Sequence, residues 1–253
     1  MPQIWTAATY EQHGRFVANL ASDVLALLDP QAGERILDLG CGDGALTQQL
    51  VQRGAVVTCL DSSPTLVQSA RAKGLDVVLG SGERLAYSDA FEAVFSNAAL
   101  HWMLDQHAML GGVRRALTTS GRFVAEMGGH GNIAAIRAAL TAAMEPYGID
   151  AEAQGANVFF TVDEYGTMLQ DHGFSIDVIE LVARPTLLPT GIEGWLQTFR
   201  RSVLDDLSQD AQRAVVERVA KVLRPILCDR SGRWFADYVR LRFRAYASKH
   251  REA

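Results

Sequence analysis

The stretch 36–47 constrains the fold of this chain more than any other, because an apolar run passes directly into a glycine-rich turn. The turn has three glycines at alternate positions, Gly40, Gly42 and Gly44. Without Cβ atoms the backbone can turn tightly, adopt positive φ angles and come close to a ligand. A helix expected from about Gly44 points unpaired N–H groups at whatever lies above the turn. Asp38 adds a negative charge beside this opening, so the pattern predicts the floor of a nucleotide-like cofactor site that suits a cationic ligand.

The next segments complete a βαβ unit. The apolar run 56–60 is typical of a parallel strand buried on both faces. It ends at Asp61, after which Ser63 is a suitable N-cap and Pro64 a suitable first residue for a helix that ends near Gly74. Asp61 therefore stands at the tip of the second strand, where a doubly wound fold receives the hydroxyls of a ribose.

Strand and helix patterns alternate five times in the first half of the chain. The strands are expected at 35–39, 56–60, 76–79, 93–95 and 122–127. Together with two later strands, this alternation predicts an α/β fold with a doubly wound, Rossmann-like sheet of seven mostly parallel strands.

The second half has a different pattern. Asp163 is a candidate cap for a helix, and alternating residues predict strands at 174–182 and 238–246, with a mostly helical stretch between them. We therefore expect a single domain over the whole chain. Its parts are an N-terminal helical cap (1–30), a cofactor-binding core (31–127) and a helical insertion (184–233) that acts as a lid.

Composition narrows the range of partners. The formal net charge of −5 argues against nucleic acid or an anionic membrane surface, because both bind clustered cations. The three cysteines, Cys41, Cys59 and Cys228, show no CxxC spacing, so neither a disulfide framework nor a metal site is indicated. The first residues lack the basic and apolar regions of a signal peptide, and no stretch is apolar enough to span a bilayer. We expect a cytoplasmic monomer or homodimer that binds a small molecule.

These residues together resemble the seven-stranded, doubly wound (class I) methyltransferases that depend on S-adenosylmethionine. The resemblance covers 35–127 well and rests on the motif at 37–44, Asp61, the segment 95–102 and the turn at 120–123. Leu100-His101-Trp102 is similar to the branch that includes trans-aconitate methyltransferase and other small-molecule enzymes. The resemblance implies S-adenosylmethionine as cofactor, S-adenosylhomocysteine as product, and methylation of a carboxylate or hydroxyl oxygen on a small acceptor.

The resemblance also implies roles for the residues around the turn. Asp38 and the backbone of Gly40 and Gly42 would hold the methionine part of the cofactor, and Asp61 would take both ribose hydroxyls. An acid often meets the adenine amine after the third strand, but this chain has Ser81 at that position. The complete set of expected cofactor residues is Tyr10, Asp38, Gly40, Cys41, Gly42, Asp61, Ser62, Ser81, Gly82, Glu83, Asn97 and Ala98.

Methyl transfer from a sulfonium is an in-line displacement that positioning alone can accelerate greatly, and the sequence shows no obligatory catalytic signature. His101 and His130 are the candidate catalytic residues. His101 is either a general base or a buried histidine bonded to the backbone. The expected acceptor-binding residues are His101, Trp102, Glu126, His130 and Arg200. Arg200 either clamps a carboxylate or lies on a solvated helix face.

Three arginines alternate along the last expected strand, Arg240, Arg242 and Arg244. Their spacing places them on one face of that strand, where they mark either an anion or subunit contact or, as we expect, partnered surface charge.

Two other functions fit part of the pattern. Gly40, Gly42 and Ala45 satisfy a permissive dinucleotide fingerprint, so an NAD-dependent oxidoreductase is one alternative. Asp38 speaks against it, because its charge would face a pyrophosphate. A non-catalytic S-adenosylmethionine-binding regulatory protein is the other alternative, since its donor site would look the same.

Overall fold

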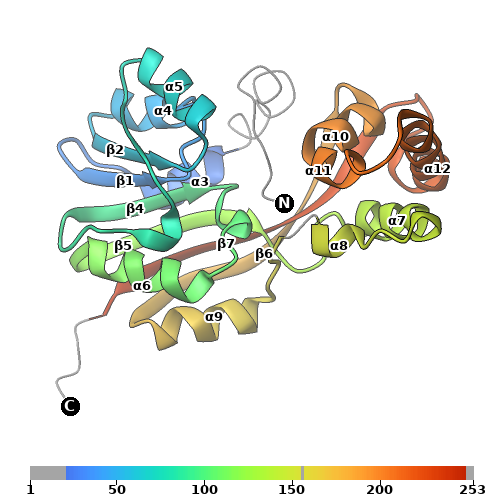
Figure 1. Ribbon diagram of the computed structural model, residues 1–253. Helices are drawn as coiled ribbons and strands as arrows, with labels where there is room; N and C mark the ends of the chain where they lie inside the picture. The colour runs from blue at the N-terminus through green and yellow to red at the C-terminus, as the bar shows by residue number, and fades with distance from the viewer. Residues whose placement is uncertain (1–20, 155–156, 249–253) are drawn as a thin grey trace.

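A seven-stranded sheet forms the centre of the computed structural model, which describes residues 21–154 and 157–248 (Figure 1). The strands are β1 (Arg35–Leu39), β2 (Val56–Asp61), β3 (Asp76–Leu79), β4 (Phe91–Asn97), β5 (Leu117–Gly128), β6 (Phe174–Leu188) and β7 (Trp234–Ala247). Their order in the sheet is β3-β2-β1-β4-β5-β7-β6. The first five strands are parallel, whereas β7 is antiparallel to both β5 and β6. The predicted doubly wound, mostly parallel sheet is therefore confirmed.

Helices cover both faces of this sheet (Figure 1). One face carries α3 (Ser22–Leu28), α4 (Thr47–Gln52) and α5 (Pro64–Ala72), and the other carries α6 (Gln106–Ala116) and α9 (Val162–Asp171). Successive side chains of a strand point to opposite faces. In β1, Ile36 accordingly packs in the cluster that includes residues of α3 and α4, and Leu37 packs in the cluster that includes residues of α6 and α9.

The remaining α-helices of the described chain contribute to a separate hydrophobic cluster, and we call them the helical lobe. It contains α7 (Ala134–Met144), α8 (Ala151–Gln154), α10 (Gly191–Phe199), α11 (Arg201–Leu204) and α12 (Gln209–Leu227). Short 3-10 helices occur at Gly82–Arg84, Leu100–Trp102 and Glu145–Tyr147. The lobe lies to one side of the sheet, on the part of β6 and β7 that projects beyond it (Figure 1). It is built from two parts of the chain, because α7 and α8 follow β5 and the other three helices lie between β6 and β7.

Strands β6 and β7 form a long antiparallel pair, which we call the β6–β7 hairpin although α10, α11 and α12 lie between the two strands in the sequence. This pair is longer than the alternation pattern predicts. Pairing continues from Phe174 and Ala247 to Leu188 and Trp234, six residues past the expected end of β6. Only the part of β7 from Arg240 onward also pairs with β5. The outer part of the hairpin is stable because its apolar side chains pack against the lobe helices.

Two helix starts differ from the expectation. Helix α9 is capped by Thr161 rather than Asp163: the Thr161 hydroxyl accepts from the Glu164 N–H, and the Glu164 carboxylate accepts from the Thr161 N–H. This reciprocal capping box satisfies two helix-end donors. Helix α4 begins at Thr47 rather than near Gly44, although the Gly44 carbonyl already accepts a helical bond from Gln48 N.

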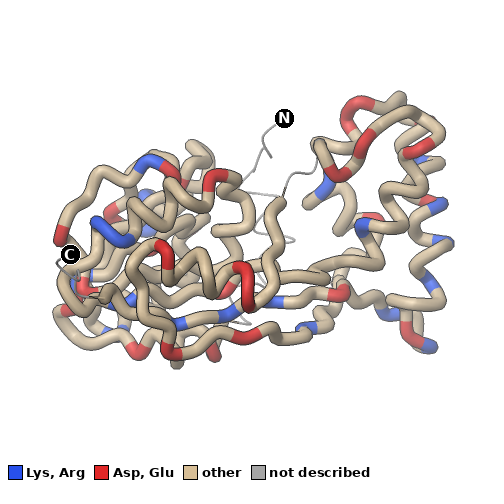
Figure 2. The backbone as a smooth tube through the Cα atoms, turned by 90° about the horizontal axis from the view of Figure 1, so that it is seen from below, with Lys and Arg blue, Asp and Glu red and all other residues tan. Residues whose placement is uncertain are grey.

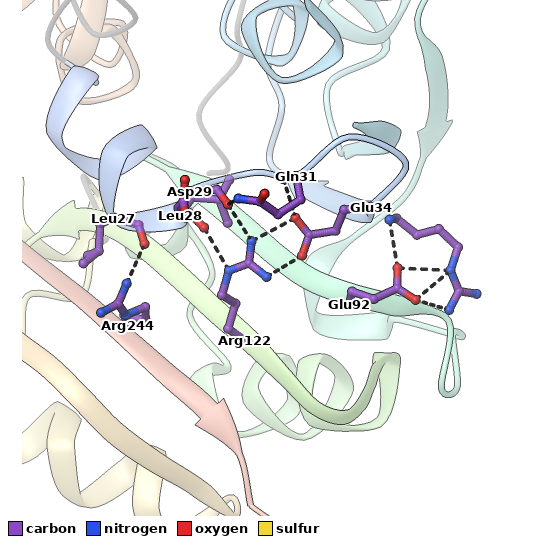
Figure 3. Close-up of polar contacts among 9 residues, drawn as sticks. Leu27, Leu28, Asp29, Gln31, Glu34, Glu92, Arg122 and Arg244 are labelled. Carbon is purple, nitrogen blue, oxygen red and sulfur yellow. Dashed lines mark hydrogen bonds and ion pairs between the residues drawn. The ribbon is translucent and has the colours of Figure 1, made fainter. Parts of the chain in front are cut away.

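Arginine contacts connect central strands of the sheet to one another and to α3 (Figure 3). Arg122 on β5 pairs with Glu34 and donates from Nε to the carbonyl of Leu28, 2.9 Å away, which holds the end of α3 against the sheet. Arg35 at the start of β1 pairs with Glu92 on β4. Glu92 therefore has a structural role.

Charge is distributed over the whole molecule. Acidic and basic positions are interspersed along the described chain, as Figure 2 shows. Among residues 21–154 and 157–248, no helix has the length and apolar character needed to cross a membrane.

Candidate active site

A cavity of about 260 Å³ lies where the carboxyl ends of the parallel strands meet the helical lobe. Ligands of doubly wound folds bind at this edge of the sheet. The sheet end of the cavity includes Gly40, Gly42, Asp61, Ser62, Ser81, Gly82 and Glu83. The segment after β4 contributes Asn97, Ala98, His101 and Trp102. The lobe end includes Asn157, Phe159, Trp195, Arg200, Tyr238 and Arg240.

The glycine turn forms the floor of the sheet end. Gly40 has φ +77°, and a Cβ on it would lie 2.3 Å from the Cβ of Ala99, so only glycine fits this position. The Gly40 N–H donates to the carbonyl of Leu60 at 2.7 Å, and the Gly42 N–H donates to Oδ2 of Asp61 at 2.9 Å. The turn is therefore tied to the end of β2.

Asp61 presents a carboxylate at the tip of β2 and lines the cavity. Burial raises the pKa of Asp61, and the N–H groups of Ser63 and Gly42 partly offset this effect. The Ser63 N–H donates to Oδ1 at 2.8 Å. A carboxylate can accept about four hydrogen bonds, so capacity remains for the two hydroxyls of a ribose.

Asp38 lies behind the turn and is not among the residues that line the cavity. It is 3% exposed and accepts a bond from the Thr47 hydroxyl at 2.6 Å. Burial raises the pKa of Asp38 to about 7, although the Thr47 bond opposes the rise. Cys41 is also buried and does not line the cavity.

Ser81, Gly82 and Glu83 line the sheet end after β3. The Ser81 hydroxyl accepts from the Glu83 N–H, and the Glu83 carboxylate accepts from the N–H of Asp105, the N-cap of α6, at 2.9 Å. Glu83 is therefore held in place by the start of α6. Tyr10 lies outside the described residues.

His101 lines the cavity in the 3-10 helix after β4. Its Nδ1 accepts a bond from the backbone N–H of Gly128 at 3.2 Å, so the neutral ring carries its proton on Nε2. Burial lowers the pKa of His101 well below its ordinary value, and the charges of Arg240 and Arg200 lower it further. This geometry makes His101 a neutral hydrogen-bond donor and does not support the base role.

The structure does not bring Glu126 and His130 to the cavity. Glu126 is 2% exposed and forms ion pairs with Arg184 and with Arg242, whose Nε lies 2.8 Å from its Oε2. It is the centre of a buried ion-pair cluster on β5. His130 is exposed at the loop that follows β5.

Most of the lobe end was not identified from the sequence. Arg200 is the exception, since the sequence predicts it as an acceptor-binding residue. It donates from Nη1 to Oδ1 of Asn157 at 2.9 Å. The indole N–H of Trp195 donates to the Tyr238 hydroxyl at 2.6 Å. Tyr238 and Arg240 are two residues apart on β7 and share a face. That alternation is the one signal in the sequence that links them.

Comparison with known proteins defines the class of this protein. A family model described as a methyltransferase domain matches residues 37–125, from β1 into β5. An uncharacterized methyltransferase of Schizosaccharomyces pombe is 36% identical over 259 residues, covering 97% of this chain and 99% of that protein. The chain belongs to the methyltransferase family, and its cofactor is S-adenosylmethionine. The family assignment excludes the NAD-dependent oxidoreductase.

Two further comparisons are weaker, the first because it covers less than half of the chain and the second because the sequence identity is low. Trans-aconitate 2-methyltransferase of Mycolicibacterium gilvum is 38% identical over 109 residues, which is 42% of this chain and 43% of that enzyme. The crystal structure of an S-adenosylmethionine-dependent methyltransferase from Mesorhizobium loti has a TM-score of 0.54 and 22% identity, covering 88% of this chain and 95% of that one. At this identity the likeness concerns the fold alone.

Proposed function

We propose that this methyltransferase transfers a methyl group to a carboxylate or hydroxyl oxygen of a small-molecule acceptor. The observation that supports this most directly is the continuity of the cavity, which joins the glycine turn and Asp61 to the lobe end. A donor at one end and an acceptor at the other then meet near the segment after β4, where His101 lies.

The residues of the sheet end fit S-adenosylmethionine. Asp61 has free acceptor capacity for the ribose hydroxyls, and the backbone of Gly40 and Gly42 can approach the ligand closely. Asp38, behind the turn, would stabilise the positive charge of the ammonium group electrostatically, without direct contact. When bound, the cofactor supplies a methyl group that is already activated by the positive charge of its sulfonium.

The protein's task is then to orient the acceptor and exclude water. Holding two reactants in line can supply on the order of 7–11 kcal/mol of the barrier. A carboxylate acceptor is ionised at neutral pH and requires no general base. His101, as a neutral donor, would orient the acceptor through its Nε2–H. The trans-aconitate enzyme, similar to part of this chain, supports an acid as acceptor.

The other expectations remain part of this proposal. The partner is a small molecule rather than nucleic acid or a membrane, the protein is a cytoplasmic monomer or homodimer, and the helices between β6 and β7 act as a lid over the acceptor.

Release of S-adenosylhomocysteine tests the proposal. The protein is incubated with S-adenosylmethionine and, separately, with small carboxylic acids, phenols, amines and lipids. We expect release with members of the acid or phenol sets and a methyl ester or ether as the second product. Calorimetric binding of S-adenosylmethionine without turnover on any set would instead support the non-catalytic regulatory protein.

A further inference from the structure

Arg240 is a buried cation at the lobe end of the cavity. It is 7% exposed, and its guanidinium carbon lies 4.3 Å from the centroid of the Tyr238 ring. Its side chain makes no hydrogen bond or ion pair with any residue in the described part of the chain. The next two arginines on the same strand face, Arg242 and Arg244, each form ion pairs with carboxylates. The expectation of partnered surface charge is therefore wrong for Arg240.

The strand itself explains this difference. Arg242 and Arg244 lie on the part of β7 that passes beside α3, where the charged ends of their side chains meet acidic residues. Arg240 lies at the position where β7 leaves β5 and enters the lobe. Its side chain is consequently directed into the cavity, where the described lobe-end lining residues include no Asp or Glu.

A second arginine and an amide line the same end. Arg200 is 5% exposed and its guanidinium carbon lies 5.9 Å from the Trp195 ring centroid. Burial lowers the pKa of Arg200 to about 10, so it remains a cation at neutral pH. Asn157, which accepts a bond from Arg200, has a buried Nδ2 with no hydrogen-bond partner among the described residues.

These groups are all hydrogen-bond donors: the guanidinium groups of Arg200 and Arg240, the Nδ2 of Asn157 and the Nε2–H of His101. Among the described lining residues, the acidic ones are Asp61 and Glu83, and both belong to the sheet end. A buried cation without a counter-charge carries a large desolvation cost, and a buried donor without an acceptor carries a smaller one. An anion rich in acceptor oxygens would pair with Arg240, accept a bond from the Asn157 amide and be attracted by the positive charge of Arg200.

We propose that Arg240 and Arg200 bind a carboxylate of the acceptor that is a different group from the one that receives the methyl. Oxygens held by two guanidinium groups have their lone pairs engaged and their charge neutralised, which makes them poor nucleophiles. The acceptor is therefore an acid with at least two functional groups, an anchoring carboxylate and a separate reactive oxygen. This inference rests on the proposed function of the same cavity.

Calorimetry on the complex with S-adenosylhomocysteine tests the anchor without requiring turnover. The probes are succinate, glutarate and adipate, their monomethyl esters and their dimethyl esters. At least one diacid and its monomethyl ester should bind saturably, and the corresponding dimethyl ester should not. Arg240→Met should weaken the acid at least tenfold and leave the affinity for S-adenosylhomocysteine unchanged.

The controls separate an anchor from a structural arginine. Arg213→Gln removes an exposed cation from α12 and should leave acid binding unchanged. Without ligand, Arg240→Met should melt at or above the temperature of the wild type, because a buried unpaired charge is removed; a structural role would lower the melting temperature. Arg240→Lys keeps the charge but not the forked donor geometry, so it should retain part of the affinity.

Several results would overturn the inference. Absence of acid binding to the wild-type complex would do so, as would equal acid affinity in the wild type and in both Arg240 variants. A parallel loss of S-adenosylhomocysteine binding in Arg240→Met would assign this arginine to the carboxylate of the cofactor. Failure of the wild type itself to bind S-adenosylhomocysteine would instead contradict the proposed function.

Discussion

Asp38 makes the stability of the ligand-free protein depend on pH in the direction opposite to that of most carboxylates. Its pKa rises from the ordinary 3.8 to about 7 because the side chain is buried behind the glycine turn. Between these two values the folded protein holds a proton that the unfolded chain has lost. Stability is therefore fully present below pH 3.8 and decreases as the pH rises through 7.

The size of the effect follows from the shift. The rise from 3.8 to about 7 corresponds to about 4 kcal/mol in total. About 3 kcal/mol of this should be lost between pH 5 and pH 8, where urea unfolding is practical. Asp38→Asn has no such proton. It also keeps an amide oxygen that can accept the Thr47 hydroxyl, so the hydrogen bond behind the turn is preserved.

The experiment is urea unfolding of the wild type and Asp38→Asn from pH 5 to pH 8, at constant ionic strength and without cofactor. The difference in unfolding free energy should grow with pH in favour of the variant. Asp76→Asn, which changes an exposed carboxylate at the start of β3, should follow the wild type. Parallel curves for the wild type and Asp38→Asn would refute the reasoning.

Three further experiments test other parts of the structure. Asp61→Ala should weaken S-adenosylmethionine binding at least tenfold by calorimetry with an unchanged circular dichroism spectrum; unchanged affinity would show that the ribose is held elsewhere. Gly40→Ala and Gly33→Ala both force alanine to a positive φ, at roughly 1 kcal/mol, but only at Gly40 does the new Cβ meet another atom, so urea unfolding should show a further loss of about 2 kcal/mol there. Glu126→Gln should cost about 3 kcal/mol of unfolding free energy, because it removes the buried carboxylate that pairs with two partly buried arginines, and leave S-adenosylmethionine affinity intact; loss of affinity without loss of stability would restore its role in the site.

The sheet end of the cavity could be anticipated because its signals are local. Three of the five residues 40–44 are glycines, which allow a tight turn, and Asp61 directly follows an uninterrupted apolar strand. The bounds of β1 and β3 coincide with those expected, since each is a short run between clear turn residues. Proximity of the strand ends then follows from parallel topology.

The lobe end could not be anticipated in the same way. Asn157, Arg200 and Arg240 come from three separate parts of the sequence, and their meeting depends on how two helical segments pack over β6 and β7. The regular alternation of Arg240, Arg242 and Arg244 predicts that they share one face of the strand. It does not predict which elements pack against that face. The parts of the structure that cover this one strand therefore separate a cavity residue, Arg240, from two arginines that form ion pairs, Arg242 and Arg244.

The projecting β6–β7 hairpin has a consequence for how such enzymes can diversify. The glycine turn of the proposed donor site belongs to the parallel strands, whereas the lobe end, which is the proposed acceptor wall, is carried by β7, by the segment before α9 and by α10. Substitutions or exchanges in the lobe can reshape the acceptor wall while every donor contact is inherited unchanged. Evolution can therefore explore new substrates in this scaffold without first losing the reaction.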